Sequence, residues 1–304
     1  MAKLGQKTLT KKDYRLLIYL FPFMLIVVLF SYVPLIGWGL AFFDYFPGIP
    51  LNEMEFVGFG QFERVFKDIS NIGRVMKNTV TFALLGYLVS PLPVVMAISL
   101  NEVKSPNLKR IIQTVTTFPN FISWVIIYAV AFQFFSNDGL VSTLFQKLGL
   151  VDKPFSLLAN ADSVYVFQTM LGVWKGVGWS CVLYLAAIVG IDQELFEAAD
   201  IDGASRMQKI FHITVPSILP TFIVLSLLAI SSFVGVGFDQ YFLFNNGMVA
   251  DKIEVIDLYV YRVGLMKSDY SFGTAVGIMK SVIAIAMLFG VNGLSKKIRG
   301  YSII

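Results

Sequence analysis

Charged side chains are scarce in this sequence of 304 residues. Asp, Glu, Lys and Arg together make up 14% of it, whereas a soluble domain carries about 25%. Apolar residues make up 56%, and the mean hydropathy is +0.72. So few polar side chains cannot cover a surface that faces water, so most of the surface must face lipid. The composition therefore excludes an ordinary soluble domain.

Cysteine and histidine are almost absent, with one residue of each. The single thiol excludes a disulfide framework, a thiolate metal cluster and a C-x-x-C redox motif. We expect Cys181, which lies in an apolar run, to be a small packing residue. One imidazole, His212, cannot build a metal site, and its place at the cytoplasmic end of an expected helix indicates an interfacial role.

Nucleotide-binding and catalytic motifs are also missing. No G-x-x-x-x-G-K-[ST] sequence occurs, so the chain does not bind ATP through a P-loop. No nucleophile and base are recognisable. The pI of about 9.0 does not indicate nucleic acid, because Lys and Arg flank apolar runs and form no single stripe. We expect a protein that is not an enzyme and binds no cofactor of its own.

Long uncharged runs dominate what is present. Four runs of 24 to 29 residues carry no formal charge, and two more are each interrupted by one lysine. A membrane-spanning helix needs about 20 residues, whereas a barrel strand needs only about 10 alternating ones. The first run lacks a small-residue cleavage site and is expected to be a retained helix. Six spanning helices are predicted, at 16–38, 79–100, 111–135, 164–190, 210–234 and 273–295.

Prolines within these runs predict kinks, which neighbouring helices can stabilise; they are Pro22, Pro34, Pro91, Pro93, Pro119, Pro216 and Pro220. Periodicity cannot distinguish the faces of these helices, because every face is apolar. The sequence shows no internal repeat and no separate soluble domain. A pathway between two halves would therefore need a partner chain.

The distribution of Lys and Arg predicts the orientation. With the N-terminus inside, the inner segments contain 13 Lys and Arg in 53 residues, and the outer segments contain 9 in 106. This asymmetry follows the positive-inside rule and puts both termini in the cytoplasm. The inner segments are 1–15, 101–110, 191–209 and 296–304, and the outer ones are 39–78, 136–163 and 235–272. We expect an N-terminal tail (1–15), a first helix with its outer loop (16–78), a five-helix core (79–295) and a C-terminal tail (296–304).

The inner segment between the fourth and fifth spans is unusually acidic, with five carboxylates in residues 192–202. Apolar residues recur there at helical spacing, and Asp202-Gly203 is a turn signal. We expect two short amphipathic helices suited to docking against another protein. The apolar positions are Phe196, Ala199, Gly203, Met207 and Ile210.

The same segment closely resembles the EAA loop of binding-protein-dependent ABC importer permeases. Glu197-Ala198-Ala199 is followed after three residues by Gly203, and after nine more by Ile213, then by Val215-Pro216. Val215 departs from the usual leucine. The resemblance implies that this loop couples to a cytoplasmic ATPase. The coupling residues it implies are Glu197, Ala198, Ala199, Asp202, Gly203, Ala204, Ile213 and Pro216.

Other stretches resemble the carbohydrate branch of that family, including alginate-type and oligosaccharide importers: 56–66 with Asn78-Thr79, 174–204, 237–244 and 259–283. The resemblance implies an all-α, type I importer permease of six helices in a prokaryotic cell membrane. Its implied partners are a second permease, two copies of an ATPase that uses ATP and Mg, and an extracytoplasmic solute-binding protein that delivers the carbohydrate. No nucleic acid is expected.

Polar and aromatic residues inside the spans are candidates for the substrate pathway. A charged side chain near the bilayer centre costs about 2.5–3.5 kcal/mol on insertion scales, so it usually faces a cavity or a partner. Lys175 and Lys280 therefore stand out; the alternatives are a partner permease's carboxylate for Lys175 and snorkelling for Lys280. Aromatic platforms with a few polar groups suit sugars. The candidates are Asn120, Trp124, Tyr128, Lys175, Trp179 and Lys280, with Asn120, Trp124 and Tyr128 expected on one helix face.

Three alternatives remain open at this point: a permease of the same class for a non-sugar solute, an ion-coupled secondary transporter, and an intramembrane enzyme. A secondary transporter usually shows two related halves within one chain, which this sequence lacks.

Overall fold

The computed structural model describes residues 11–231 and 237–299 of the chain, and helices make up nearly all of its regular structure. Six helical stretches of the described residues are long and apolar enough to cross a membrane. The all-α polytopic class is therefore confirmed. The stretches are Leu17–Phe42, Ile69–Asn101, Trp124–Lys147, Val164–Val189, Arg206–Ala229 and Tyr270–Gly290. The end of the predicted fifth span, 232–234, lies outside the described residues, as do parts of both expected tails.

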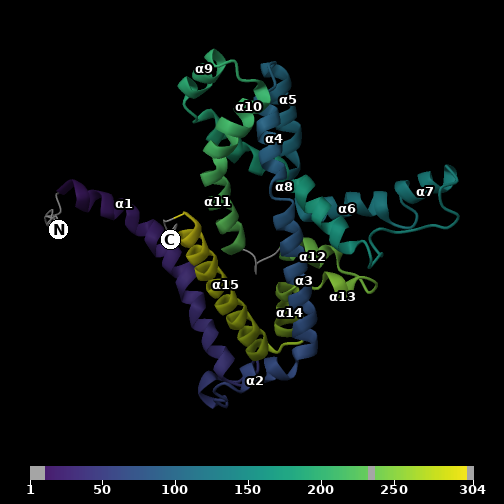
Figure 1. Ribbon diagram of the computed structural model, residues 1–304. Helices are drawn as coiled ribbons and strands as arrows, with labels where there is room; N and C mark the ends of the chain where they lie inside the picture. The colour runs from purple at the N-terminus through teal and green to yellow at the C-terminus, as the bar shows by residue number, and fades with distance from the viewer. Residues whose placement is uncertain (1–10, 232–236, 300–304) are drawn as a thin grey trace. The chain divides into compact units, whose positions relative to one another are not determined.

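The helices are numbered in chain order in Figure 1. Their bounds are α1 Lys11–Val27, α2 Gly60–Lys67, α3 Ile69–Leu88, α4 Leu92–Asn101, α5 Pro106–Thr117, α6 Trp124–Phe135, α7 Leu140–Lys147, α8 Val164–Val189, α9 Gln193–Ile201, α10 Arg206–Lys209, α11 Val215–Ser231, α12 Phe238–Phe244, α13 Ala250–Ile253, α14 Ile256–Tyr261 and α15 Tyr270–Arg299. Short π- or 3₁₀-helical turns join several of them, among them Val33–Phe42, Phe118–Phe121 and Ile210–Thr214.

The chain divides into two compact units, each described here by itself. Unit 1 holds the described residues up to Lys67 together with Val260–Ile278, and unit 2 holds Asp68–Tyr259 and the described residues from Met279 onward. The sequence predicts a boundary at residue 78, whereas the contacts place the end of the N-terminal unit at Lys67.

Unit 1 joins the N-terminal helix and its following loop to the segment before and within the start of α15. Arg64 forms a 2.6 Å ion pair with Asp269, and the backbone N–H of Tyr45 donates to the Ser271 hydroxyl at 2.9 Å. Gly264 and Gly273 meet so closely that a Cβ atom on Gly273 would lie 2.8 Å from the Gly264 backbone. The Arg64–Asp269 and Tyr45–Ser271 contacts tie together segments that are 205 and 226 residues apart in the sequence.

In unit 2, α8 is the central helix, and α3, α4, α5 and α11 all pack against it. A buried apolar cluster lies where α4, α8 and α11 meet, and it includes Leu100, Leu185 and Ile218. Cys181 belongs to this cluster and is 1% exposed, as expected of a small packing residue. Gly178 lets α5 approach α8 so closely that a Cβ atom there would lie 2.1 Å from the Thr116 carbonyl oxygen.

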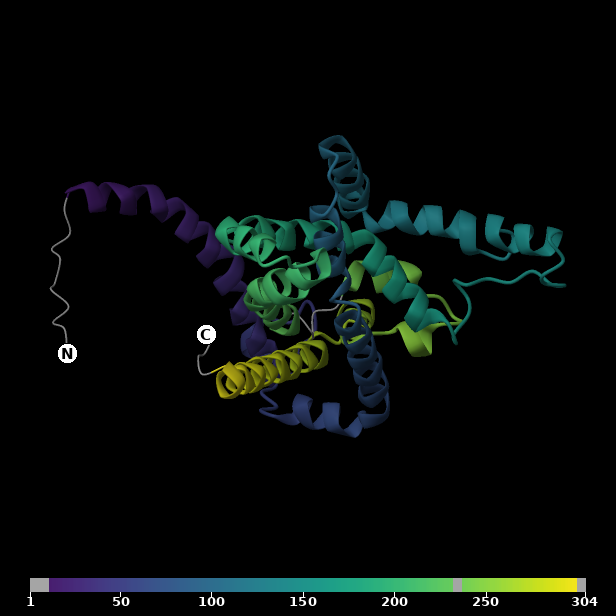
Figure 2. The ribbon, with the colours of Figure 1, turned by 45° about the horizontal axis from the view of Figure 1, so that its top comes forward.

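The predicted third span, 111–135, is not one helix. The helix α5 ends at Thr117, and a 3₁₀ turn and two extended residues separate it from α6. Pro119 cannot donate a backbone hydrogen bond, and the Ser123 side chain caps α6 by accepting from the Ile126 N–H. Figure 2 shows α5 and α6 leaving this break in different directions. The expectation that Asn120 shares a helix face with Trp124 is therefore wrong, whereas Trp124 and Tyr128 do lie on one helix.

Candidate functional site

The acidic loop folds as two short helices, α9 and α10, joined by a turn. Gly203 makes the turn with φ of +72°, a left-handed conformation that favours glycine. The Ser205 hydroxyl and the Gln208 side chain form a capping box at the start of α10. Lys209 forms a 2.7 Å ion pair with Asp200 across the turn. The structure therefore has the break between the two helices at Asp202-Gly203, where the sequence predicts it.

One side of this loop packs against the helices α4, α8 and α11 of the same unit, and the other side is exposed. Phe196 and Ile213 pack against the buried cluster of α4, α8 and α11. Glu197, Ala198, Asp202, Gly203 and Pro216 are exposed, and Ala199 and Ala204 are half-buried. Four large apolar side chains are also exposed: Leu195, Ile201, Met207 and Phe211. The predicted apolar stripe is therefore divided, because Phe196 packs inward while Met207 faces outward.

Lys175 supports the break between α5 and α6. Its ammonium donates to the carbonyl oxygens of Pro119 at 3.2 Å, Asn120 at 2.9 Å and Ile122 at 2.5 Å. Helix ends leave carbonyls without an intrahelical partner, and a cation at a C-terminal end also suits the helix dipole. Lysine has three N–H donors, so these three carbonyls use all of them. The ammonium is therefore occupied by the chain's own backbone, in contrast to the predicted contact with a substrate or a partner permease.

The predicted aromatic residues gather around the same break. The Lys175 ammonium lies 5.5 Å from the ring centroid of Trp124, within cation–π range. Trp179 packs edge-to-face on Phe121 at 6.0 Å, and Tyr128 packs edge-to-face on Phe244 at 5.1 Å. The structure thus brings four of the predicted residues together at the break, with Tyr128 one turn further along α6.

Lys280 pairs with a carboxylate within the chain. Its ammonium forms a short ion pair with Asp257 of α14, and both side chains are mostly buried. Sequence reasoning did not identify Asp257, which lies 23 residues before Lys280. The structure thus places Lys280 in an internal ion pair, in contrast to both predicted roles, a contact with substrate and snorkelling to the surface.

Unit 2 also contains an open cavity of about 550 Å³, lined mainly by residues of α3, α8, α11 and α12. This volume lies in the range of about 300–1,000 Å³ that ligand pockets occupy. Small residues on one face of α8, namely Gly172, Gly176 and Ser180 at spacings of four, create the hollow. None of the six residues predicted for the substrate pathway, all of which the structure describes, lines this cavity. They are Asn120, Trp124, Tyr128, Lys175, Trp179 and Lys280.

Both polar and aromatic groups line the cavity. Tyr87, Tyr184 and Tyr241 contribute rings, and Ser90 and Ser226 contribute hydroxyls. Gln240 of α12 donates to the backbone carbonyl and the side-chain oxygen of Gln168 on α8, both at 2.8 Å. Burial raises the pKa of Tyr241, so its phenol stays neutral. Tyrosine faces, amides and hydroxyls are the groups that bind uncharged polyols.

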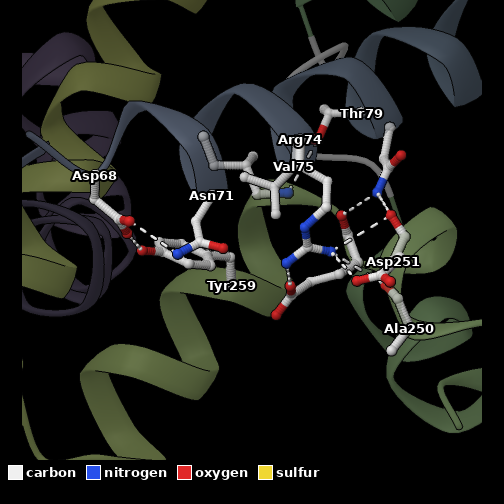
Figure 3. Close-up of polar contacts among 11 residues, drawn as sticks. Asp68, Asn71, Arg74, Val75, Thr79, Ala250, Asp251 and Tyr259 are labelled. Atoms are coloured by element: carbon white, nitrogen blue, oxygen red, sulfur yellow. Dashed lines mark hydrogen bonds and ion pairs between the residues drawn. The ribbon is translucent and has the colours of Figure 1, made fainter. Parts of the chain in front are cut away.

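A polar network holds the α13–α14 segment against α3, as Figure 3 shows. Arg74 forms a 2.6 Å ion pair with Glu254. Asn78 donates to the carbonyls of Asp251 and Glu254, and the Thr79 hydroxyl accepts from the Ile256 N–H at 3.0 Å. At the other end of the network the Tyr259 hydroxyl donates to Asp68 at 2.5 Å. Because Tyr165 of α8 also donates to Asn78 at 2.6 Å, the network fixes the segment that follows the cavity helix α12.

Comparison with known proteins identifies the family of the chain. A family model described as "Binding-protein-dependent transport system inner membrane component" matches residues 89–300. The chain belongs to this family. A crystal structure of a bacterial ABC transporter involved in import of the acidic polysaccharide alginate contains a similar chain, with 32% identity, a TM-score of 0.85, and 95% of this chain and 97% of that one covered. The type I importer permease fold is thereby confirmed.

Two curated relatives of this ABC permease come from Bacillus subtilis (strain 168). Protein LplB is 39% identical over 289 residues, covering 94% of this chain and 90% of its own. The polygalacturonan/rhamnogalacturonan transport system permease protein YteP is 35% identical, covering 93% of this chain and 88% of its own. The family assignment decides against an ion-coupled secondary transporter, and it describes a transport protein, not an enzyme.

Sequence reasoning missed most of the cavity. The polar residues Gln168 and Ser226 lie within apolar runs. Because every face of those runs is apolar, the sequence does not show which face of the helix lines a cavity. Gln240 lies in a stretch, 237–244, that resembles the family, but the resemblance did not indicate which side chain lines a cavity. The usable signal was small: residues 172, 176 and 180 of α8 are all Gly or Ser.

Proposed function

We propose that this chain is a transmembrane permease subunit of an ATP-driven importer that carries an oligosaccharide or polysaccharide fragment. It acts with a second, homologous permease, two copies of a cytoplasmic ATPase that uses ATP and Mg, and an extracytoplasmic solute-binding protein. The observation that carries this proposal is similarity along almost the whole chain to YteP and to the alginate importer permease. A second crystal structure contains the alginate transporter in complex with an alginate pentasaccharide-bound periplasmic protein. The similar chain in that structure is 31% identical to this chain, with a TM-score of 0.86.

The loop between α8 and α11 is the proposed docking site for the ATPase. Leu195, Ile201 and Met207 expose apolar surface, with Ile201 87% exposed. Glu197 is exposed on α9, the short helix that also carries Leu195 and Ile201. Apolar groups surrounded by charge are typical of protein interfaces. Movement of the ATPase would be transmitted to α4, α8 and α11 through Phe196 and Ile213, because both side chains pack on the buried cluster that these helices form.

The cavity of unit 2 is the proposed wall of the carbohydrate pathway. Sugars present flat C–H faces and a rim of hydroxyl groups, which match aromatic rings and neutral hydrogen-bonding groups. The cavity offers both types of group, whereas the residues around the helix break are occupied by one another. In this proposal the break positions α6, and Lys175 supports the break through its three backbone contacts.

The proposal is tested by reconstitution. The complete complex, with both permeases and the ATPase, is placed in liposomes with the solute-binding protein. Uptake of labelled neutral and acidic oligosaccharide pools is measured with and without ATP, beside pools of amino acids and inorganic anions. We expect ATP-dependent uptake of a carbohydrate pool only. Uptake of amino acids or anions in place of carbohydrate would contradict the proposal.

A further inference from the structure

The cavity of unit 2 is uncharged. Among the described residues that line it there is no Asp, Glu, Lys, Arg or His. Burying an unpaired charge is costly, because the charge loses its hydration and gains no counter-charge. A carboxylate entering this cavity would meet neutral hydroxyls, amides, phenol rings and apolar side chains such as Val173, Val177 and Leu225.

The lysines within the spans cannot supply the missing positive charge. The three N–H donors of Lys175 bind the carbonyls of Pro119, Asn120 and Ile122. Lys280 is paired with Asp257. Both cations are thus committed to groups of the chain itself, and neither lines the cavity.

Two buried hydroxyls in the cavity have no partner within the described part of the chain. The Oγ atoms of Ser90 and Ser226 are inaccessible to solvent and form no hydrogen bond, and both residues line the cavity. Ser226 is only 9% exposed. Buried polar atoms are nearly always satisfied, so an unpaired one needs an explanation. Neither Oγ atom is accessible from the cavity in this conformation, so a ligand would reach a serine hydroxyl after that side chain turns toward the cavity. A ligand hydroxyl can then both donate to and accept from the serine hydroxyl, whereas a carboxylate can only accept.

Gln168 and Gln240 extend this pattern. The amide nitrogen of Gln240 is used by Gln168, which leaves the Gln240 oxygen to accept and the Gln168 nitrogen to donate. The cavity thus presents donors and acceptors in mixed order, next to the Tyr241 ring. Mixed donors and acceptors match hydroxyl groups, each of which needs both.

We propose that this cavity selects an uncharged, hydroxyl-rich glycan segment and disfavours a uronic acid at this position. The inference rests on the proposed carbohydrate transport and adds the charge class of the segment that contacts this chain. It separates the chain from two relatives, the alginate importer permease and YteP, which are both named for polysaccharides that contain uronic acids.

The first test uses a matched pair of charges. Ser180 lies on the cavity face of α8 and is half-buried. Ser180→Lys and Ser180→Asp are assembled with the partner subunits, and ATP-driven uptake of the transported pool is measured per assembled complex. If the segment is neutral, both charges hinder it, and the two rates lie within threefold of each other. A rate at least tenfold higher for the lysine variant than for the aspartate variant would overturn the proposal.

The second test removes one hydroxyl. Ser226→Ala should lower uptake several-fold, because the glycan loses the hydroxyl that the Ser226 side chain presents when it turns toward the cavity. Ser99→Ala is the control, since the Ser99 hydroxyl is exposed and donates to the Val95 carbonyl in its own helix. Equal uptake by both alanine variants and the wild-type chain would contradict a role for Ser226.

A third test uses the wild-type complex, so its result does not depend on whether a variant folds. We expect it to accumulate labelled neutral arabino-, xylo- or manno-oligosaccharides, whereas accumulation of oligogalacturonides or alginate fragments alone would overturn the charge assignment. Failure to accumulate any carbohydrate would instead contradict the proposed function, so the two failures are distinguishable.

Discussion

Lys175 shows how a single residue can look like a substrate ligand in the sequence and be structural in the fold. Its position inside an apolar run made it a candidate for the pathway, yet its ammonium is surrounded by backbone carbonyls. The break at Pro119 interrupts the α-helical hydrogen bonding, and the Pro119 carbonyl accepts from the Ile122 N–H at 3.2 Å. An ammonium is the donor that can satisfy several carbonyls at such a break. The lysine and the proline therefore belong to one structural feature.

Lys175→Met should destabilise the protein without changing substrate selectivity. Each hydrogen bond to a charged group contributes about 1.5–3 kcal/mol, and methionine keeps the bulk while removing all three donors. The measurement is thermal unfolding of the purified complex with a thiol-reactive dye, since Cys181 is the only cysteine of this chain and is buried. We expect a lower Tm and lower uptake, with the same ratio of neutral to acidic sugar uptake. An unchanged Tm together with an altered ratio would return Lys175 to the substrate pathway.

At the scale of elements, the all-α class and the number of membrane-spanning stretches could be predicted from the sequence. Long uncharged runs have few alternatives to a helix in a bilayer. The interruption of the third run could not be predicted with the same certainty. Pro119 and Ser123 both signal a helix boundary, but an unbroken apolar run of spanning length favours one helix. Long-range pairs such as Lys280 and Asp257 depend on packing, which a single sequence does not show. The turn at Gly203 was predictable because Asp-Gly is a local signal.

The turn between α9 and α10 makes a prediction about coupling. Gly203 has φ of +72°, and a Cβ atom there would meet no atom within 4 Å. A side chain at this position is therefore limited by backbone conformation and not by space within this chain. Gly203→Val should cost about 1–2 kcal/mol in the left-handed region, whereas asparagine adopts that region more readily.

The two substitutions are compared by ATPase co-purification and by uptake. We expect Gly203→Val to lower both and Gly203→Asn to stay near the wild-type values. Equal loss in both variants would show that the ATPase packs directly on Gly203. Normal co-purification and uptake in both would remove the loop from the coupling interface.

At the scale of the whole molecule, contacts within unit 2 join segments that the charge pattern assigns to one side of the membrane. Lys252 pairs with Asp162 at 3.0 Å, and Asn246 donates to the Leu158 carbonyl at 2.9 Å, so two expected outer segments meet. On the other side, Phe196 of the acidic loop packs against the cluster that contains Leu100 at the end of α4. The fold and the Lys and Arg distribution thus agree on which loops share a side.

The orientation that follows can be tested by cysteine labelling in intact cells. In a Cys181→Ala background, Lys153→Cys should react with a membrane-impermeant maleimide from outside, because 136–163 is an expected outer segment and Lys153 is exposed. Gln193→Cys, exposed at the start of α9, should react only after the membrane is permeabilised, because the positive-inside rule places 191–209 in the cytoplasm. Labelling of Gln193→Cys in intact cells would put the acidic loop outside, where no cytoplasmic ATPase could reach Glu197 or Gly203.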